Sequence, residues 1–327
     1  MKPDISSLAK QILDGDRRAL SQAITLVEST RIDDRESAYI LLEQLIPYSG
    51  NSLRLGVSGV PGVGKSTFIE AIGNHVIEQG HRLAVLTIDP SSSVNGGSIL
   101  GDKTRMNTLS RKEEVFIRPS PTGSTLGGVS RRSRETMILC EAAGYDVVMI
   151  ETVGVGQSET EVSNMTDMFL LLLLPGAGDE LQGIKRGIME LADLVLINKA
   201  DDELTSLALR AQAEFRSALR ILNPTMTAEE QVDVLTCSSR DGSGLSEVWA
   251  TVKTYVESQR QSGGFSERRT TQAKNWMWME VYQTLLDSFK SDNEVGLKIP
   301  HFEAAIKDGT LPPTLAARKL LDIFLKK

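Results

Sequence analysis

Residues 59–67 read Gly59-Val60-Pro61-Gly62-Val63-Gly64-Lys65-Ser66-Thr67 and fit the pattern G-x-x-x-x-G-K-[ST]. An apolar run, 53–57, precedes them and a segment with helical character, 68–72, follows, which is the context that a phosphate-binding loop requires. The glycines permit a tight turn whose backbone N–H groups point at phosphates, and the next helix adds its positive end. Lys65 would neutralise the β- and γ-phosphates, and Ser66 would offer a hydroxyl to Mg²⁺. The stretch therefore predicts a nucleoside triphosphate site.

Short apolar runs alternate with helical stretches from residue 52 to about residue 256, the pattern of a parallel sheet covered on both faces. The predicted strands are Leu53–Ser58, Leu83–Asp89, Val115–Pro119, Asp146–Glu151, Met168–Pro175, Leu194–Asn198 and Val232–Cys237. The predicted helices are Ser66–Glu78, Arg132–Ala143, Leu204–Ile221 and Leu245–Val256. We therefore expect an α/β protein, a P-loop NTPase with a mostly parallel sheet covered by helices.

Both ends of the chain carry helical spacing of apolar residues. Residues 1–50 predict two or three amphipathic helices that end at a turn-forming cluster, 47–51. After a hinge at 262–264, a stripe of Trp, Met and other apolar residues at 276–289 and a further segment, 311–325, also predict helices. The stripe either packs against the nucleotide domain or forms a dimer or partner surface. The expected organisation is an N-terminal helical segment, a nucleotide-hydrolysing domain and a C-terminal helical segment, at 1–50, 51–260 and 261–327.

Composition narrows the class of protein. The 327 residues suffice for one large domain with appendages or for two domains, and the net charge of −7 argues against a non-specific nucleic-acid binder. The longest apolar run, 168–174, is far shorter than the ~20 residues of a membrane-spanning helix. The first residues lack the features of a signal peptide, so we expect a cytoplasmic protein with no membrane partner. Cys140 and Cys237 are too few for a disulfide framework and are expected in the core.

A second motif predicts which base is bound. Asn198-Lys199-Ala200-Asp201 follows an apolar strand and fits N-K-x-D. The carboxylate of Asp201 can accept hydrogen bonds from N1–H and the N2 amino group of guanine, whereas adenine would leave it unpaired. A site built in this way rejects the wrong base by roughly 10⁴-fold, so GTP is favoured over ATP. Asn198 and Lys199 would support the loop and lie along the base, and Thr236-Cys237-Ser238-Ser239 could offer a backbone N–H to guanine O6.

A third motif, Glu151-Thr152-Val153-Gly154, ends the strand that starts at Asp146. Most GTPases carry Asp at its first position, but either carboxylate can reach Mg²⁺ or its water shell. The N–H of Gly154 can bond the γ-phosphate, so that hydrolysis would release the loop. Asp89 and Asp102 flank or lie within a long glycine-rich connection. Together with Ser66 and Glu151 they could surround Mg²⁺, provided that some of the four act through water. The alternative for Asp89 and Asp102 is that they are solvated carboxylates of the loop.

Direct participants in catalysis are expected to be Lys65, Asp102 and Glu151. No general base stands out, because His75, His81 and His301 are scattered. Slow intrinsic hydrolysis is therefore expected, which a partner can accelerate by completing the positioning and the charge. A basic run at 130–134 is expected to be a solvated face, with a phosphate or partner contact as the alternative.

With these residues in place, the chain resembles the MeaB/ArgK-type GTPases over nearly its whole length. Besides the three nucleotide motifs, the resemblance rests on D-P-S-S at 89–92, G-G-S-I-L-G-D-K-T-R-M at 96–106, E-T-V-G-V-G-Q-S-E at 151–159 and Q-G-I-K-R-G at 182–187. One departure is Ser93-Val94-Asn95, where Thr is expected before the glycine pair in place of Asn. Asn tolerates left-handed backbone conformations that a β-branched Thr avoids, so the details of the first switch can differ.

The resemblance implies a homodimeric G-protein chaperone of the adenosylcobalamin-dependent methylmalonyl-CoA mutase, which couples GTP binding and hydrolysis to cofactor loading and protection. It also implies that Asp89, Asp102 and Glu151 surround Mg²⁺ and that the C-terminal helices form the dimer. Segments 90–106 and 152–162 would be switches and 179–187 a third mobile loop facing the mutase. One alternative is a kinase of an arginine/ornithine transport system, which would normally need ATP. The other is a metallocentre-assembly GTPase, which typically needs Cys or His clusters.

Overall fold

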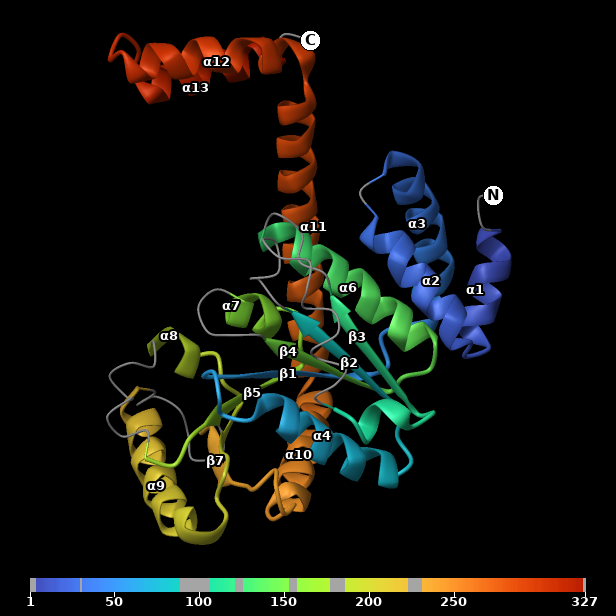
Figure 1. The fold of residues 1–327 in the computed structure, drawn as a ribbon, viewed down its shortest axis with the longest axis vertical. Helices are drawn as coiled ribbons and strands as arrows, with labels where there is room; N and C mark the ends of the chain where they lie inside the picture. Colours follow the sequence, from blue (N-terminus) through green and yellow to red (C-terminus); the bar gives the residue numbers. More distant parts are fainter. Residues whose placement is uncertain are drawn as a thin grey trace. The chain divides into compact units, whose positions relative to one another are not determined.

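Figure 1 shows the computed structural model, which describes residues 4–29, 31–88, 106–120, 126–152, 158–176, 186–222 and 231–325. The chain divides into two compact units, Met1–Thr270 and Thr271–Lys327.

A parallel sheet of seven strands lies at the centre of the first unit in the described part of the chain. Every neighbouring pair is parallel, with Leu55 of the central strand opposite Met149 on one side and Met168 on the other. Across the sheet, the strands are β3 (Val115–Ser120), β2 (Leu83–Ile88), β4 (Val147–Thr152), β1 (Leu53–Gly59), β5 (Met168–Leu173), β6 (Leu194–Ile197) and β7 (Asp233–Thr236). The predicted α/β fold is confirmed, and β1 occupies the central position beside which such sheets bind ligands.

Helices cover the two faces of this sheet. On one face, α4 (Lys65–Glu78) and α10 (Leu245–Ser262) pack their apolar side chains against alternate residues of the strands, such as Leu55 and Val57 of β1. On the other face lie α6 (Leu126–Ala142) and α7 (Ser158–Ser163). A Cβ on Gly56 would lie only 2.8 Å from Val162 of α7, so the missing side chain lets α7 approach the sheet. Farther along, α9 (Thr205–Leu222) packs against β6 and β7.

Three N-terminal helices, α1 (Ile5–Leu13), α2 (Arg17–Glu28) and α3 (Ile32–Leu45), precede the sheet and end in a 3₁₀ turn. The side chains of Asp4 and Asp16 cap the first two by accepting backbone N–H bonds. All three helices pack against one another and against α6. The helices expected in residues 1–50 are therefore present.

Two residues of the basic run on α6, Ser133 and Arg134, do not lie on the solvated face that we expected. Arg134 is only 8% exposed and Ser133 is fully buried. The expectation is wrong for these residues because α6 is sandwiched between α2 and α3 on one side and the strands β2, β3 and β4 on the other.

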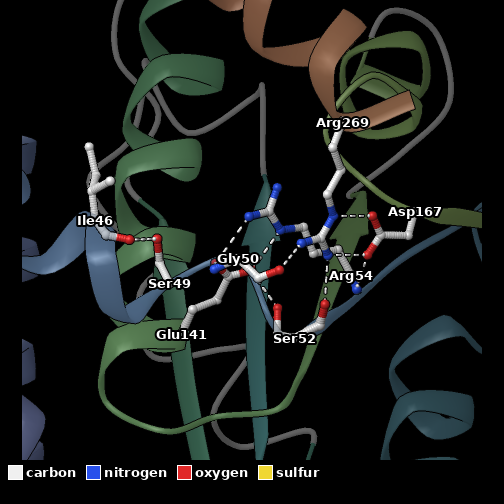
Figure 2. A network of polar contacts seen from close by, with 8 residues as sticks. All are labelled: Ile46, Ser49, Gly50, Ser52, Arg54, Glu141, Asp167 and Arg269. Atoms are coloured by element: carbon white, nitrogen blue, oxygen red, sulfur yellow. Dashed lines mark hydrogen bonds and ion pairs between the residues drawn. The ribbon is translucent and has the colours of Figure 1, made fainter. Parts of the chain in front are cut away.

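Charged groups connect the amino edge of the sheet to its covering helices (Figure 2). Arg54 of β1 pairs with Glu141 of α6, with an Nε–Oε1 distance of 2.7 Å, and Glu141 also accepts from Gly50 N and Ser52 Oγ. Arg269, from the start of α11 (Gly264–Ser291), donates two bonds of 2.7 Å to Asp167, the residue before β5. The same guanidinium donates to the carbonyl groups of Gly50 and Ser52.

The neighbouring Arg268 makes an equivalent pair with Asp193, the residue before β6, at 3.0 Å, and Tyr255 of α10 donates to the same carboxylate. Two successive arginines thereby hold the first turns of α11 against the entry points of β1, β5 and β6. Of these strands, β1 and β6 lead into two of the nucleotide motifs at their opposite ends.

The second unit contains the remainder of α11 together with α12 (Asn293–Lys307) and α13 (Pro313–Leu325). The aromatic rings of Phe289 and Phe324 pack edge to face at 5.5 Å, and α12 packs against α13. We had not predicted α12, which contains Pro300. The stripe at 276–289 is largely exposed, and its exposed members are Met277, Trp278, Met279, Val281, Tyr282, Leu285 and Leu286.

Two further expectations concern the chain as a whole. None of the helices in the described ranges combines the length and apolarity needed to cross a membrane. Cys140 and Cys237 are both free and buried, as predicted.

Candidate nucleotide site

The predicted phosphate loop leaves the carboxyl end of β1 and leads into α4, which begins at Lys65. Gly62 and Gly64 adopt positive φ angles of 80° and 95°, a conformation that L side chains rarely adopt. Gly59 is also required, because a Cβ there would lie 2.4 Å from the backbone oxygen of Leu172. The loop thus has the tight backbone path that phosphate binding needs.

Lys65 is folded back onto this loop. Its Nζ donates to the carbonyl oxygen of Gly59 at 2.7 Å and to that of Val60 at 3.3 Å. The pKa of Lys65 is lowered overall, because burial outweighs the opposing charges of Glu151 and Glu159. The side-chain nitrogen of Lys65 thus already lies beside the loop that would hold the phosphates.

The N-K-x-D segment contacts the phosphate loop directly. Asn198 donates from Nδ2 to Val63 O at 2.8 Å, and Lys199 donates from Nζ to Gly62 O at 2.8 Å. Lys199 has a positive φ of 60°, which is uncommon outside glycine and often marks a functional site. The side chains of Asn198 and Lys199 therefore fix the distance between the base-reading segment and the phosphate loop.

The segment at 236–239 also contacts the N-K-x-D segment, through Asn198. Ser239 donates from its backbone N at 3.2 Å and from Oγ at 2.8 Å to Asn198 Oδ1. The N–H of Ser238 donates to Ser243 O at 3.0 Å. Because both N–H groups bond within the protein, a role for Ser238 and Ser239 in reading guanine O6 stays a prediction.

Asp201, the last residue of the N-K-x-D segment, has a side chain that is 12% exposed. Arg240, to which the sequence motifs assign no role, places Nη1 3.7 Å from Asp201 Oδ2 and 3.2 Å from Asp202 Oδ2. The carboxylate of Asp201 thus lies beside a mostly exposed cation, and its role as the acceptor for guanine stays a prediction.

The magnesium prediction rests on two described residues. Ser66 donates from Oγ to Glu151 Oε1 at 2.9 Å, and Glu151 is 4% exposed. A hydroxyl and a carboxylate are the hard oxygen ligands that Mg²⁺ takes alongside phosphates and water, so the pair fits this ion. Asp89, Asp102 and Gly154 lie outside the described residues. Within those residues, no group of three or more His, Cys, Asp and Glu side chains could hold a metal ion.

A further buried carboxylate is that of Glu159, the last residue of the motif at 151–159, which is 2% exposed on α7. Glu159 and Val162, three residues apart on α7, share one face of this short helix, and both are buried. A carboxylate on such a buried face indicates a constrained charge.

Comparisons with known proteins agree with these motifs. The family model described as "Methylmalonyl Co-A mutase-associated GTPase MeaB" matches residues 20–294. A relative from Caulobacter vibrioides is 51% identical over 321 residues, which are 98% of each chain. "GTPase ArgK" from Escherichia coli is 46% identical over 316 residues, covering 96% of this chain and 95% of that one. The solved "LAO/AO transport system kinase" has a TM-score of 0.77 and 38% identity, and the match covers 100% of this chain and 99% of that chain.

Proposed function

Because the chain belongs to the MeaB family of methylmalonyl-CoA mutase-associated GTPases, we propose that it is a GTP-dependent chaperone of that mutase. In this role it assists adenosylcobalamin loading and protects the mutase, and the state of the bound nucleotide controls the interaction. The protein is a GTPase; the chaperone role and the residues that carry it are our proposal.

One observation carries the assignment of the site. Asn198 and Lys199 bond the carbonyl groups of Val63 and Gly62 at 2.8 Å each. This direct connection supports a single site in which the loop 59–67 binds the phosphates while Asp201 reads the base. Guanine offers two donors to that carboxylate, which supports GTP over ATP.

Ser66 and Glu151 would hold Mg²⁺, with Asp89 and Asp102 as further candidate ligands. When bound, the ion neutralises charge on the β- and γ-phosphates. Lys65 would leave the carbonyl groups of Gly59 and Val60, to which it now donates, and bond the phosphates instead.

Hydrolysis in this site depends on positioning and charge. Lys65 would stabilise the developing negative charge, and Glu151 would orient the metal's ligands. Asp102 is the third candidate for a direct catalytic role, and Gly154 would bond the γ-phosphate. Slow intrinsic turnover is expected, with acceleration when the mutase completes the site.

The C-terminal unit would form a homodimer. Large apolar side chains on α11, including Trp278 at 53% exposure and Tyr282 at 66%, support burial against a second copy, since aromatic residues and Met are enriched in interface cores. We expect the complex to act in the cytoplasm, without nucleic acid or membrane partners.

The decisive experiment uses a purified adenosylcobalamin-dependent methylmalonyl-CoA mutase and the full chain. Co-elution on size exclusion is compared with a non-hydrolysable GTP analogue and with GDP, and the GTPase rate is measured with and without the mutase. We expect nucleotide-dependent complex formation and faster hydrolysis. A mutase that neither binds nor changes the GTPase rate refutes the chaperone role.

A matched variant separates base reading from folding. In Asp201→Asn the amide would pair poorly with guanine but well with xanthine, which carries an acceptor at C2. We expect loss of GTP binding and recovery of complex formation with XTP. Unchanged GTP affinity in this variant would contradict the role of Asp201.

The transport-kinase alternative draws on the name of the 38% identical structure. It would require phosphate transfer to an acceptor protein and normally ATP, so incubation with γ-labelled ATP and GTP tests it. The metallocentre-assembly alternative is tested by adding nickel or zinc and measuring its effect on the GTPase rate.

A further inference from the structure

The turn that carries Asp201 is bounded by two residues in an unfavourable backbone conformation. Lys199 and Asp202 have positive φ angles of 60° and 47°, and they are the two non-glycine residues with positive φ in the described part of the chain. Such a conformation costs free energy and persists only where surrounding contacts hold it. The turn 199–202 therefore depends on neighbouring segments to keep Asp201 in place.

Each of these two residues is held by a side-chain contact to a different neighbouring segment. Lys199 donates from Nζ to Gly62 O of the phosphate loop at 2.8 Å. On the other side of Asp201, Arg240 donates from Nη1 to Asp202 Oδ2 at 3.2 Å. The phosphate loop and the segment after β7 thus tether the turn at its two ends, and the second tether is the side chain of Arg240.

Arg240 reaches the turn from a segment that is bonded within itself. Ser238 Oγ accepts from the backbone N of Arg240 at 3.3 Å and from the backbone N of Asp241 at 3.4 Å. The backbone of this segment also accepts from the turn, since Ala200 N donates to Cys237 O at 3.0 Å. The backbone that carries Arg240 is therefore fixed relative to the turn that its side chain contacts.

The same guanidinium lies close to the carboxylate of Asp201. Arg240 Nη1 is 3.7 Å from Asp201 Oδ2, and the side chain of Asp201 is 12% exposed whereas that of Arg240 is 77% exposed. This distance is too long for a hydrogen bond, so the contact attracts the carboxylate without occupying an acceptor position. An ionised carboxylate has about four such positions, and guanine needs one for N1–H and one for the N2 amino group. Arg240 therefore orients Asp201 and leaves its acceptor positions available to a base.

From this arrangement we propose that Arg240 is a positioning residue for base recognition. It holds Asp202, and with it the turn that carries Asp201, and it keeps the Asp201 carboxylate in one orientation, in which both oxygens accept from guanine. The proposal deepens the proposed function and rests on it, because Asp201 is the residue that reads the base there. Its consequence is that Arg240 strengthens the preference for guanine over hypoxanthine, a base that keeps N1–H but lacks the amino group.

The test compares the affinities of GDP and inosine diphosphate (IDP), measured in the full-length protein with Mg²⁺ by displacement of a fluorescent GDP analogue. The two nucleotides have the same phosphates and the same charge, so their affinity ratio reports the bond from the N2 amino group. In Arg240→Met the Asp201 carboxylate can rotate, and it then keeps one bond to the base more readily than two. We expect the GDP:IDP affinity ratio to fall by about two- to fivefold, the range that an exposed ion pair supports. Structural damage would weaken both nucleotides alike.

Arg210→Met is the matched control. The side chain of Arg210 is exposed to a similar degree, at 79%, and its Nε lies 3.0 Å from Glu214 Oε1 on the same helix. This variant loses the same charge and an exposed ion pair, and we expect its GDP:IDP ratio to equal that of the wild type. Arg240→Lys keeps the charge without the planar group, so its ratio should lie between those of Arg240→Met and the wild type. Arg240→Gln also removes the charge and decides the matter if Arg240→Met does not fold.

Two results would overturn the inference. One is a GDP:IDP ratio in Arg240→Met that equals the wild-type ratio, whether or not both affinities fall. The other is tighter binding of GDP by this variant, which would mean that Arg240 competes with the base for Asp201. If the wild type prefers GDP over IDP and Arg240→Met keeps that preference in full, this inference alone fails. A wild type that binds GDP no more tightly than IDP, or binds neither, instead refutes the role of Asp201 in the proposed function.

Discussion

Replacing Arg269 by Met should strongly destabilise the first unit. The side chain of Arg269 is 14% exposed, and its guanidinium donates two bonds of 2.7 Å to Asp167, whose side chain is 2% exposed (Figure 2). It also bonds the carbonyl groups of Gly50 and Ser52. Met fills much of the same volume but leaves a buried carboxylate with only the bond from Arg54 N, at 2.8 Å.

The magnitude follows from the loss of the ion-pair partner of this buried carboxylate. Removing one partner of a buried ion pair costs about 3–5 kcal/mol, whereas an exposed pair contributes about 0–1 kcal/mol. Arg260→Met is the matched control. Arg260 is exposed, and its guanidinium lies 5.1 Å from the Phe265 ring that Arg269 also covers, at 4.3 Å. The control should cost less than about 1 kcal/mol.

Urea unfolding of the nucleotide-free protein, followed by far-ultraviolet circular dichroism, measures both variants. We expect a lower midpoint for Arg269→Met and a nearly unchanged one for Arg260→Met. Adding Asp167→Asn to Arg269→Met should recover part of the loss, because the buried charge is then removed as well. A cost for Arg269→Met no greater than that of the control would refute the reasoning.

Two other predictions test the backbone and the buried charge. Gly59→Ala should lower the urea midpoint sharply and abolish GTP binding, because its Cβ would lie 2.4 Å from a backbone oxygen of β5; wild-type stability would contradict the tight loop path. Burial alone would raise the pKa of Glu141, but the hydrogen bonds and charge of Arg54 lower it overall. Its contribution to stability is therefore complete above the unfolded-state pKa of about 4.3 and is lost as the pH falls through the lower folded-state value. Urea midpoints from pH 7 to pH 3 should show this loss in the wild type and a weaker one in Glu141→Gln, and equal slopes would contradict it.

Local sequence patterns predicted the sheet and the tight turn at residues 59–67. Each strand is a short apolar run next to a turn signal, and residues 59–67 carry their geometry in their own glycines. The hydrogen bond from Asn198 to Val63 follows from the parallel sheet, because both residues lie just after the carboxyl ends of their strands. These features depend on neighbours within a few residues or on the general layout of α/β sheets.

Features that depend on distant partners were not predictable from the sequence. Arg54 meets Glu141 across 87 residues, and Arg269 meets Asp167 across 102. Nothing in the sequence near an arginine indicates which carboxylate it will face. Arg134 reads as exposed because its run is basic, yet packing on both sides of α6 buries it. The helix α12 was not predicted because it contains Pro300, and proline usually ends a helix.

The packing of the N-terminal helices on α6 also has a consequence for synthesis on the ribosome. About 80 residues separate the end of α3 at Leu45 from the start of α6 at Leu126. Because the ribosome adds roughly 5–20 residues per second, about 4–16 s pass between the synthesis of the first three helices and the start of α6. During that interval the three helices can bury apolar side chains only against one another, so the apolar surface that α6 later covers is exposed on the nascent chain. The order of translation thus leaves the α6-facing surface of the first three helices uncovered until α6 has been made.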